Sequence, residues 1–576
     1  MGNPLLISRD NFGSSFFKSS PFWTQRNFAP AAVSLPRNNV PVDHTLHSHD
    51  RCTTTPFKYE FHEDPSYLSK IGQNIEKVRT MLSQPSHKSN AIVTVDALKK
   101  LGIDHFFGEE ISAILDVSYN NMYKTLKESD VKLTDIALQF KLLREAGYDV
   151  SSDVFQRFMN ENGEFKQYLS KDAEGLISLH EASFLNMGEE MLYTAKDFST
   201  MHLQSSVKHL GQRCGALVRH TLEHPNHMSL KQYKARHYLT QVLLHLTSDD
   251  ASLSMKELAQ TEFQLNQQLY QDEFKEIKRW WSDLGLAREL TFARDQILKW
   301  YLWSMTALPG PQFSKHRLEM TKSVSFIYII DDIFDIMVMG NPEELTLFTQ
   351  TINRWEDSSA LPGYMRAFFI ALNEVTNGIA QFVEEEYGLN PINNLRRSWA
   401  TLCNAFLVEA RWFADKQVPN AEEYLRNGIT SSGVHLAMVH LLFVLGHRVT
   451  NETLHIIEGN SALVTCTAKI LRLWDDLGSA EDENQEGFDG SYVEYYMKDN
   501  TSCSLNAAKL HTKKLISKSW EELNKEYFFN KSLSPYFKEA SLNCARMVNV
   551  MYNYDEQQQL PLMNDYIQNL LFGGNY

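Results

Sequence analysis

The sequence of 576 residues predicts an all-α protein. Apolar residues recur at three- and four-residue spacing, as in 111–115 and 138–143, which is the period of an amphipathic helix. Alternating apolar and polar runs between turn residues, the pattern of strands, are scarce. The breaks, such as 84–89 and 309–311, are short and rich in turn formers or polar residues. The chain is long enough for two α-helical domains with substantial cores.

Composition excludes several classes of protein. A net charge of −15 argues against nucleic acid or an anionic membrane as the main partner. The six cysteines lack paired spacing, so we expect reduced thiols rather than a disulfide framework or a zinc site. No uninterrupted apolar run approaches the roughly 18 residues that a membrane span needs. We therefore expect no membrane span.

The first 42 residues differ from the rest of the chain. They are rich in serine and hold Arg9, Lys18, Arg26 and Arg37 against a single acid, Asp10. Such a composition fits an organellar transit peptide, and a merely disordered tail is the alternative. We assign residues 1–50 to this segment, which favours a plastid location over the cytoplasm.

We expect a domain boundary near 255–270, in a stretch whose pattern also predicts a helix. The first domain, 56–260, carries no constellation of reactive residues that we can identify. The chemistry is therefore expected in the second domain, 265–576.

Three aspartates close an apolar run in that second domain. Asp331, Asp332 and Asp335 follow residues 324–330, which predict a buried helix. Residues four apart on a helix share a face and lie about 6 Å apart along its axis. Crowded carboxylates repel each other and suit a hard divalent cation that also holds a phosphate. A solvated acidic face is the alternative interpretation.

A second set of oxygen atoms lies at Asp475, Ser479 and Glu483. Their four-residue spacing puts all three on one helix face. A hydroxyl between two carboxylates makes little sense in a salt-bridge ladder but suits a chelate for Mg²⁺ or Mn²⁺. Two such sets on facing helices would hold a diphosphate between them.

Arginines and aromatic residues complete the candidate site. Arg472 lies three residues before Asp475, and Arg294 lies upstream of the first aspartate motif. Guanidinium groups match phosphate oxygens, although either arginine alone would be taken for a surface residue. Trp303 and Tyr552 are candidates for stabilising a carbocation with their π-faces, with core packing as the alternative.

With these motifs, the sequence resembles plant class I terpene synthases from about residue 57 to residue 572. Segments 140–151 and 409–413 add to the resemblance. It implies two α-helical domains, an inactive class II-like domain followed by a catalytic class I bundle. It further implies a prenyl diphosphate substrate, three Mg²⁺ or Mn²⁺ ions and a monomer. The implied metal ligands are Asp331, Asp332, Asp335, Asp475, Ser479 and Glu483. The implied diphosphate-binding residues are Arg294 and Arg472, with Asp331, Asp335 and Asp475 beside them.

Two departures from the family pattern point to the product. The tandem arginines near the N-terminus are missing, because only Arg51 precedes Cys52, and Gln296 replaces the second arginine of an Arg-x-Arg motif. Both departures look like those of the linalool and nerolidol synthases, which make acyclic alcohols. A less firmly held diphosphate would let water capture the cation early.

Three rival functions stay open at this point. A cyclising terpene synthase is the nearest, and a prenyl-chain elongase is the second. An elongase carries two aspartate-rich motifs, whereas the second motif of this chain is Asp475, Ser479 and Glu483. This chain is also much longer than an elongase needs to be. An all-helical scaffold with incidental acidic patches is the third.

Overall fold

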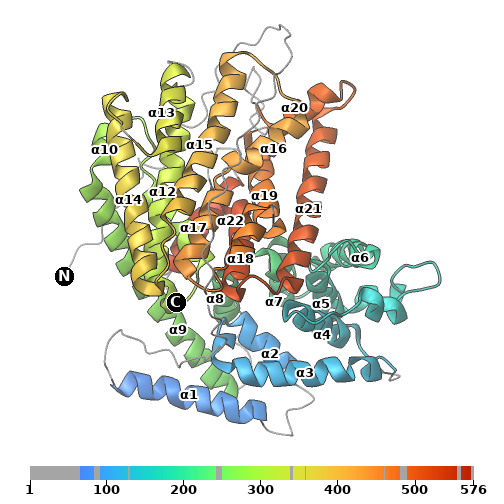
Figure 1. The fold of residues 1–576 in the computed structure, drawn as a ribbon. Helices are drawn as coiled ribbons and strands as arrows, with labels where there is room; N and C mark the ends of the chain where they lie inside the picture. The colour runs from blue at the N-terminus through green and yellow to red at the C-terminus, as the bar shows by residue number, and fades with distance from the viewer. Residues whose placement is uncertain are drawn as a thin grey trace.

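A computed structural model describes residues 65–83, 91–127, 130–241, 250–337, 342–356, 358–459, 461–479, 490–553 and 560–572 (Figure 1). The transit segment predicted at 1–50 lies outside the described residues. So does Glu483, and the side chain of Ser479 is likewise not described.

The first half of the described chain forms a group of mostly short helices, blue through teal to green in Figure 1. They are α1 (Pro65–Ser83), α2 (Ala91–Lys100), η3 (Asp104–Phe107), α3 (Gly108–Thr125), α4 (Leu133–Glu145), η4 (Ser152–Phe158), η5 (Gln167–Lys171), α5 (Ala173–Ser183), α6 (Glu190–Ser206), α7 (Gln212–Glu223), η6 (Asn226–Met228) and α8 (Lys231–Gln241).

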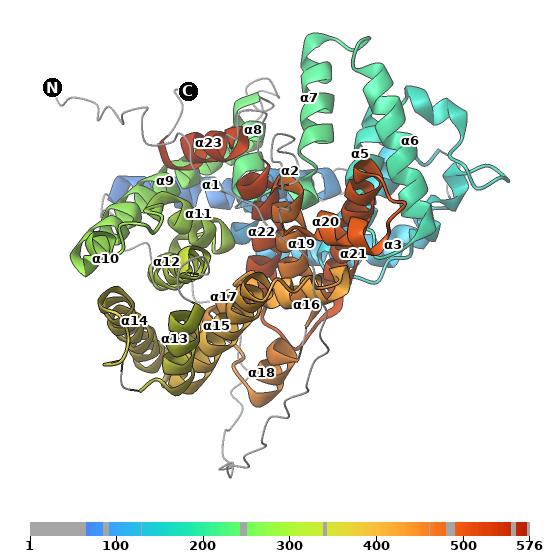
Figure 2. The same ribbon diagram turned by 90° about the horizontal axis from the view of Figure 1, so that it is seen from above.

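The second half forms a bundle, whose helices are seen largely end-on in Figure 2. They are α9 (Asp250–Leu284), α10 (Leu286–Glu289), α11 (Ile297–Ala307), η8 (Pro311–Phe313), α12 (Ser314–Met337), α13 (Pro342–Arg354), α14 (Gly363–Tyr387), α15 (Ile392–Ala414), α16 (Ala421–Ser431), α17 (Val434–Leu445), α18 (Asn451–Glu458), α19 (Ala462–Ser479), α20 (Tyr492–Asp499), α21 (Leu505–Phe529), α22 (Pro535–Tyr552), α23 (Pro561–Ile567) and η9 (Gln568–Phe572).

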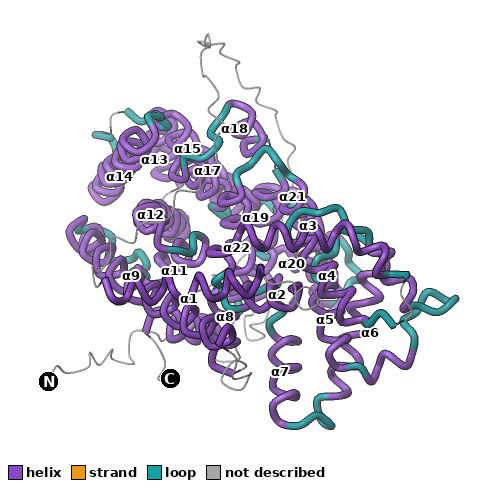
Figure 3. The backbone as a smooth tube through the Cα atoms, turned by 90° about the horizontal axis from the view of Figure 1, so that it is seen from below, coloured by secondary structure: helices purple, strands orange, loops and turns teal. Residues whose placement is uncertain are grey.

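The described residues form no β-sheet, as the tube in Figure 3 shows. A single isolated antiparallel bridge joins Met159 and Phe165. The prediction of an all-α fold is confirmed.

Helix starts follow local chemistry. The side chain of Asn420 accepts a hydrogen bond from the backbone N–H of Glu423 (2.9 Å), and the Glu423 carboxylate accepts one from the N–H of Asn420 (3.3 Å). This capping box satisfies two N–H groups that the first turn of α16 leaves without a partner. It fixes the start of α16, whose last residue, Ser431, lines the cavity described below.

The long helix α9 belongs to both halves of the fold. Near its start, Met255 and Leu258 pack into the hydrophobic core of the first half. Further along, Tyr270, Ile277 and Trp281 pack into the core of the bundle. Because one unbroken helix contributes to both cores, we propose that the predicted domain boundary falls within α9.

Helix α17 is strongly apolar and largely buried in the bundle, directly after the more polar α16. By length and composition, Ala421–Leu445 would be able to cross a membrane, since its most apolar 18-residue stretch has a mean hydropathy of 1.6. However, 72% of its most apolar stretch is buried within the fold, as in the core helix of a folded domain. The two helices are also separated at Gly433, whose φ of 76° is left-handed.

Candidate active site

The bundle encloses a cavity of about 230 Å³ between α11, α12, α15, α17, α19 and α22. Apolar side chains form much of its wall, among them Met320, Val324, Ile327, Met438 and Leu441. Its polar side is formed by Asp331, Asp335, Glu409, Arg472 and Asp475. The cavity thus joins a charged end to an apolar chamber.

Carboxylates from three helices lie at the charged end, with Glu409 supplied by α15. Asp331 and Asp335 come from α12, and Asp475 comes from α19. Asp335 is open to solvent on one side, but desolvation by the surrounding protein raises its pKa well above the usual value, and the charge of Asp331 adds to the shift. Burial also raises the pKa of Asp475, which Arg472 opposes. Carboxylates in this situation are stabilised by a bound cation.

The predicted metal ligands are only partly assembled. Among the described residues, no three histidine, cysteine, aspartate or glutamate side chains are gathered as the ligands of one ion. Asp331 is engaged by Arg294, and Glu483 lies outside the described residues. The metal roles therefore stay predictions, supported by the shared cavity of Asp331, Asp335 and Asp475.

The structure does not bring Asp332 to the cavity. Its side chain is buried, its Oδ2 accepts a hydrogen bond from the backbone N–H of Arg294 (2.7 Å), and its Oδ1 lies 2.5 Å from Arg294 Nε. Burial raises the pKa of Asp332 to about 6, although the charge of Arg294 opposes the rise. The guanidinium also donates to Asp331. Asp332 thus anchors an arginine that was predicted to bind diphosphate.

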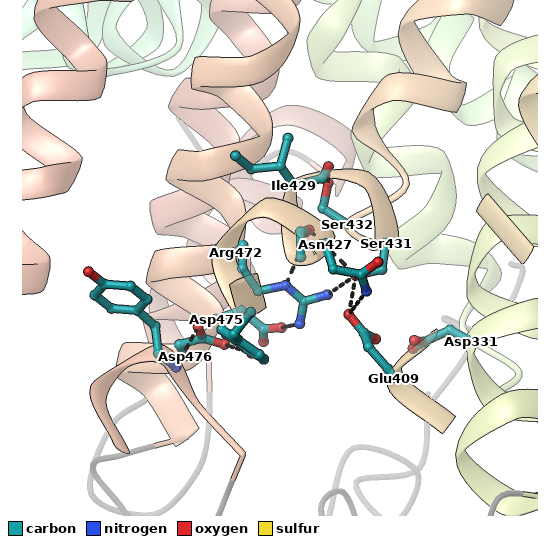
Figure 4. A network of polar contacts seen from close by, with 12 residues as sticks. Asp331, Glu409, Asn427, Ile429, Ser431, Ser432, Arg472, Asp475 and Asp476 are labelled. Atoms are coloured by element: carbon teal, nitrogen blue, oxygen red, sulfur yellow. Dashed lines mark hydrogen bonds and ion pairs between the residues drawn. The ribbon is translucent and has the colours of Figure 1, made fainter. Parts of the chain in front are cut away.

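Arg472 lies in a second polar network, which Figure 4 shows. Its Nη2 donates to Ser431 Oγ (3.0 Å), and its Nη1 lies 3.9 Å from Asp475 Oδ2. Ser431 Oγ in turn donates to Glu409 Oε1 (2.6 Å), which also accepts from Asn427 Nδ2 (2.9 Å). Burial raises the pKa of Glu409. The network holds the Arg472 guanidinium beside the carboxylate of Asp475.

Aromatic side chains line the cavity next to the carboxylates. Trp303, Tyr328 and Tyr552 all line it, and Trp303 Nε1 donates to the Tyr328 hydroxyl (2.9 Å). Lys299 Nζ lies 5.8 Å from the ring centroid of Tyr328 and 5.7 Å from that of Tyr552. The predicted placement of Trp303 and Tyr552 at one site is therefore observed, while their roles stay predictions.

The sequence reasoning missed Lys299 and assigned no role to Glu409. Burial lowers the pKa of Lys299 to about 8, and the charge of Arg294 adds to the effect. A signal existed for Lys299, which is the one charged residue in the apolar helix Ile297–Ala307, whereas Glu409 shares its helix with three arginines and gave none. A buried charge needs a partner, so such positions point to a polar site.

Two family models match the chain. Residues 282–522 match the metal binding domain of the terpene synthase family, and residues 46–222 match the terpene synthase N-terminal domain.

Several curated relatives cover most of the chain. A probable terpene synthase 13 from Ricinus communis is 45% identical over 84% of each chain, and an (E)-nerolidol synthase from Cannabis sativa is 42% identical over 87% of this chain and 91% of its own. A chloroplastic S-(+)-linalool synthase from Arabidopsis thaliana is 37% identical over 98% and 99%. A chloroplastic tricyclene synthase from Antirrhinum majus is 38% identical over 84% and 83%.

A solved structure agrees with the fold and with the family. Isoprene synthase from grey poplar leaves, crystallised with three Mg²⁺ ions and dimethylallyl-S-thiolodiphosphate, superposes with a TM-score of 0.82. It is 30% identical to this chain and covers 89% of it and 98% of its own length. With both family models matched and with relatives of up to 45% identity, the chain belongs to the terpene synthase family.

Proposed function

We propose that this terpene synthase ionises a prenyl diphosphate and lets water capture the allylic cation as an acyclic tertiary alcohol. Geranyl diphosphate would give linalool, and farnesyl diphosphate would give nerolidol. The observation that carries the proposal is one cavity that joins Asp331, Asp335 and Asp475 to an apolar and aromatic chamber. The named nerolidol and linalool synthases among the relatives support the choice of product.

The residues present fit a divalent cation. Asp331, Asp335 and Asp475, with Ser479 and Glu483, would hold Mg²⁺ through oxygen atoms, which this hard ion prefers. When bound, Mg²⁺ neutralises charge on the diphosphate and makes it a better leaving group. The isoprene synthase complex contains three Mg²⁺ ions, which supports the same number here.

Arg294 and Arg472 would bind the remaining phosphate oxygens. Arg294 is occupied by Asp331 and Asp332 in the present state. A cation on Asp331 would compete with that ion pair and leave part of the guanidinium for diphosphate. Asp332 would keep the arginine in place through its bond to the backbone N–H.

The walls of the cavity would surround the hydrocarbon part of the substrate. Apolar side chains exclude bulk water from the reactive carbons, and the π-faces of Trp303 and Tyr552 stabilise positive charge without supplying a nucleophile. We propose a monomer acting on its substrate in the plastid. The chloroplastic names of two relatives support that location.

A cyclising terpene synthase is the second candidate. The tricyclene synthase among the relatives favours it, at an identity close to that of the linalool synthase. Gas chromatography on a chiral column separates the two, after incubation with geranyl, farnesyl or geranylgeranyl diphosphate and Mg²⁺. Cyclic products as the major fraction would contradict the proposal.

The first test addresses the carboxylates. Asp331→Asn and Asp335→Asn should each lower turnover by about two or more orders of magnitude, because each removes a carboxylate from the metal site. Diphosphate release by the purified variants measures the effect. Asp415→Asn, an exposed change beyond the end of α15, is the matched control and should retain activity. Near-wild-type release from either site variant would contradict the metal assignment.

A further inference from the structure

Ser304 lines the cavity and carries a buried hydroxyl that has no hydrogen-bond partner among the described residues. Only 2% of the residue is exposed, and it lines the cavity beside Trp303 on α11. Its Oγ makes no hydrogen bond within the described part of the chain. A buried hydroxyl in this condition is disfavoured unless it meets water or a ligand.

Buried hydroxyls elsewhere on the same helices behave differently. Thr306 Oγ1 donates to the carbonyl of Leu302 (2.8 Å), and Ser325 Oγ donates to the carbonyl of Lys322 (2.7 Å). Serine and threonine within helices commonly satisfy themselves in this way. Ser304 does not, so both its donor and its acceptor capacity remain for a group inside the cavity.

The other hydroxyl groups on the described cavity wall are already engaged. Ser431 donates to Glu409, Ser432 donates to the carbonyl of Ile429, Thr467 pairs with Ser541, Tyr328 accepts from Trp303, and Tyr552 has its own polar contacts. Among the described hydroxyls of the cavity wall, Ser304 is therefore the one whose donor and acceptor capacity are both unused.

Ser304 also lines the same cavity as the carboxylates. Its neighbour Trp303 bonds to Tyr328, which is three residues, or about 4.5 Å along the helix, from Asp331. In an allylic diphosphate the tertiary carbon C3 is two bonds from the carbon that loses diphosphate. The water that attacks C3 must therefore act near the carboxylates, in the cavity that Ser304 lines together with Asp331 and Asp335.

We propose that Ser304 is the positioning residue for the water that captures the cation, an inference that rests on the proposed function. Its Oγ accepts a hydrogen bond from this water and leaves an oxygen lone pair free to form the C3–O bond. The second proton of the water passes to the departed diphosphate, which is the base already produced by ionisation. Without this water, the same cation loses a proton to diphosphate and becomes an acyclic olefin.

The test is the ratio of alcohol to olefin in the products of purified enzyme with geranyl diphosphate and Mg²⁺. Ser304→Ala should lower this ratio at least 10-fold while diphosphate release stays within a few-fold of wild type. Ser304→Thr keeps the hydroxyl and should restore much of the ratio. Ser325→Ala, a buried helical serine whose hydroxyl bonds to its own helix and does not line the cavity, is the matched control. Water labelled with ¹⁸O confirms that the alcohol oxygen comes from solvent.

The outcomes separate this inference from the function on which it rests. An unchanged ratio in an active Ser304→Ala enzyme overturns the role of Ser304 and leaves the function intact. A wild-type enzyme that forms no alcohol overturns the proposed function, and the inference with it. If circular dichroism shows that Ser304→Ala does not fold, the ratio of alcohol to olefin is measured on the near-isosteric Ser304→Cys instead. A wild-type ratio in that variant would contradict the role of the hydroxyl.

Discussion

At the scale of single residues, Arg294 and Asp332 set the charge of the candidate site before any ligand arrives. Arg294 is paired with Asp331 and Asp332, and its guanidinium lies 5.2 Å from the ring centroid of Tyr328. Asp332 is buried, whereas Asp331 is about one-third exposed. A substitution of Arg294 would therefore cost most at Asp332, because the buried carboxylate would lose its partner.

Arg294→Ala should lower the free energy of unfolding of the Mg²⁺-free enzyme by about 3 kcal/mol, because it leaves a buried carboxylate without its partner. The pKa of Asp332 rises from 3.8 to about 6 in the folded protein, so the folded state holds a proton between these values and stability falls as pH rises through them. Loss of Arg294 moves that pKa further up. Urea midpoints should therefore show a larger deficit near pH 8 than near pH 5.

The control for this substitution is Arg397→Ala. Arg397 forms an exposed ion pair with Glu458 (3.3 Å), and such pairs contribute about 0–1 kcal/mol. Equal effects of the two substitutions, or a deficit of Arg294→Ala that grows at low pH, would contradict the anchoring role of Asp332.

At the scale of elements, the break between α16 and α17 shapes the cavity wall. Gly433 has a φ of 76°, and a Cβ built on it would lie 2.5 Å from Ile327 Cγ2. Ser431, Ser432 and Gly433 line the cavity together with Ile327. Glycine therefore serves two purposes here, because it permits the left-handed turn and the close approach of α12.

Gly433→Ala should destabilise the enzyme by about 2–5 kcal/mol, from left-handed strain of about 1–2 kcal/mol and overpacking of about 1–3 kcal/mol. It should also lower turnover, because Ile327 must move and Ile327 lines the cavity. Urea midpoints and diphosphate release measure the two effects. Gly378→Ala is the control, since Gly378 lies exposed within α14 with open space at its Cβ, and should stabilise by about 0.5–1 kcal/mol. A Gly433→Ala enzyme as stable as this control would contradict the packing argument.

Helical periodicity was enough to predict the elements but not every side chain of the site. The i, i+4 spacing correctly put Asp331 and Asp335 on one face and led to the expectation that Asp475 would join them. Periodicity could not show that Asp332 points away from the cavity. The side chain of Asp332 is held by Arg294, which lies 38 positions away in the sequence, and no local pattern reveals that contact. The sequence did not point to Ser304 for a related reason, since only the cavity that it lines distinguishes it from other helical serines.

At the scale of the whole molecule, the two halves are joined by buried polar contacts as well as by α9. Asn524 on α21 is buried, and its Nδ2 donates to the carbonyls of Phe184 (3.0 Å) and Asn186 (2.9 Å) in the first half. Its Oδ1 lies 2.7 Å from His227 Nε2. Burial lowers the pKa of His227 to about 4, so its ring is neutral at pH 7. The ring donates through Nε2, since the amide oxygen can only accept.

Asn524→Ala should therefore weaken both halves together, by about 3 kcal/mol, because two carbonyls and one imidazole N–H lose their buried partner. For a chain of this size that corresponds to a fall of about 2–3 °C in the temperature of thermal unfolding. Differential scanning calorimetry at a fixed scan rate measures the fall, and hydrogen exchange should speed up around 184–186 and 520–528 alike. Asn404→Ala, at an exposed position on α15, is the control and should shift the transition by less than about 1 °C. Faster exchange confined to one half would mean that the halves are stabilised separately, and that the first half does not brace the bundle in which the cavity lies.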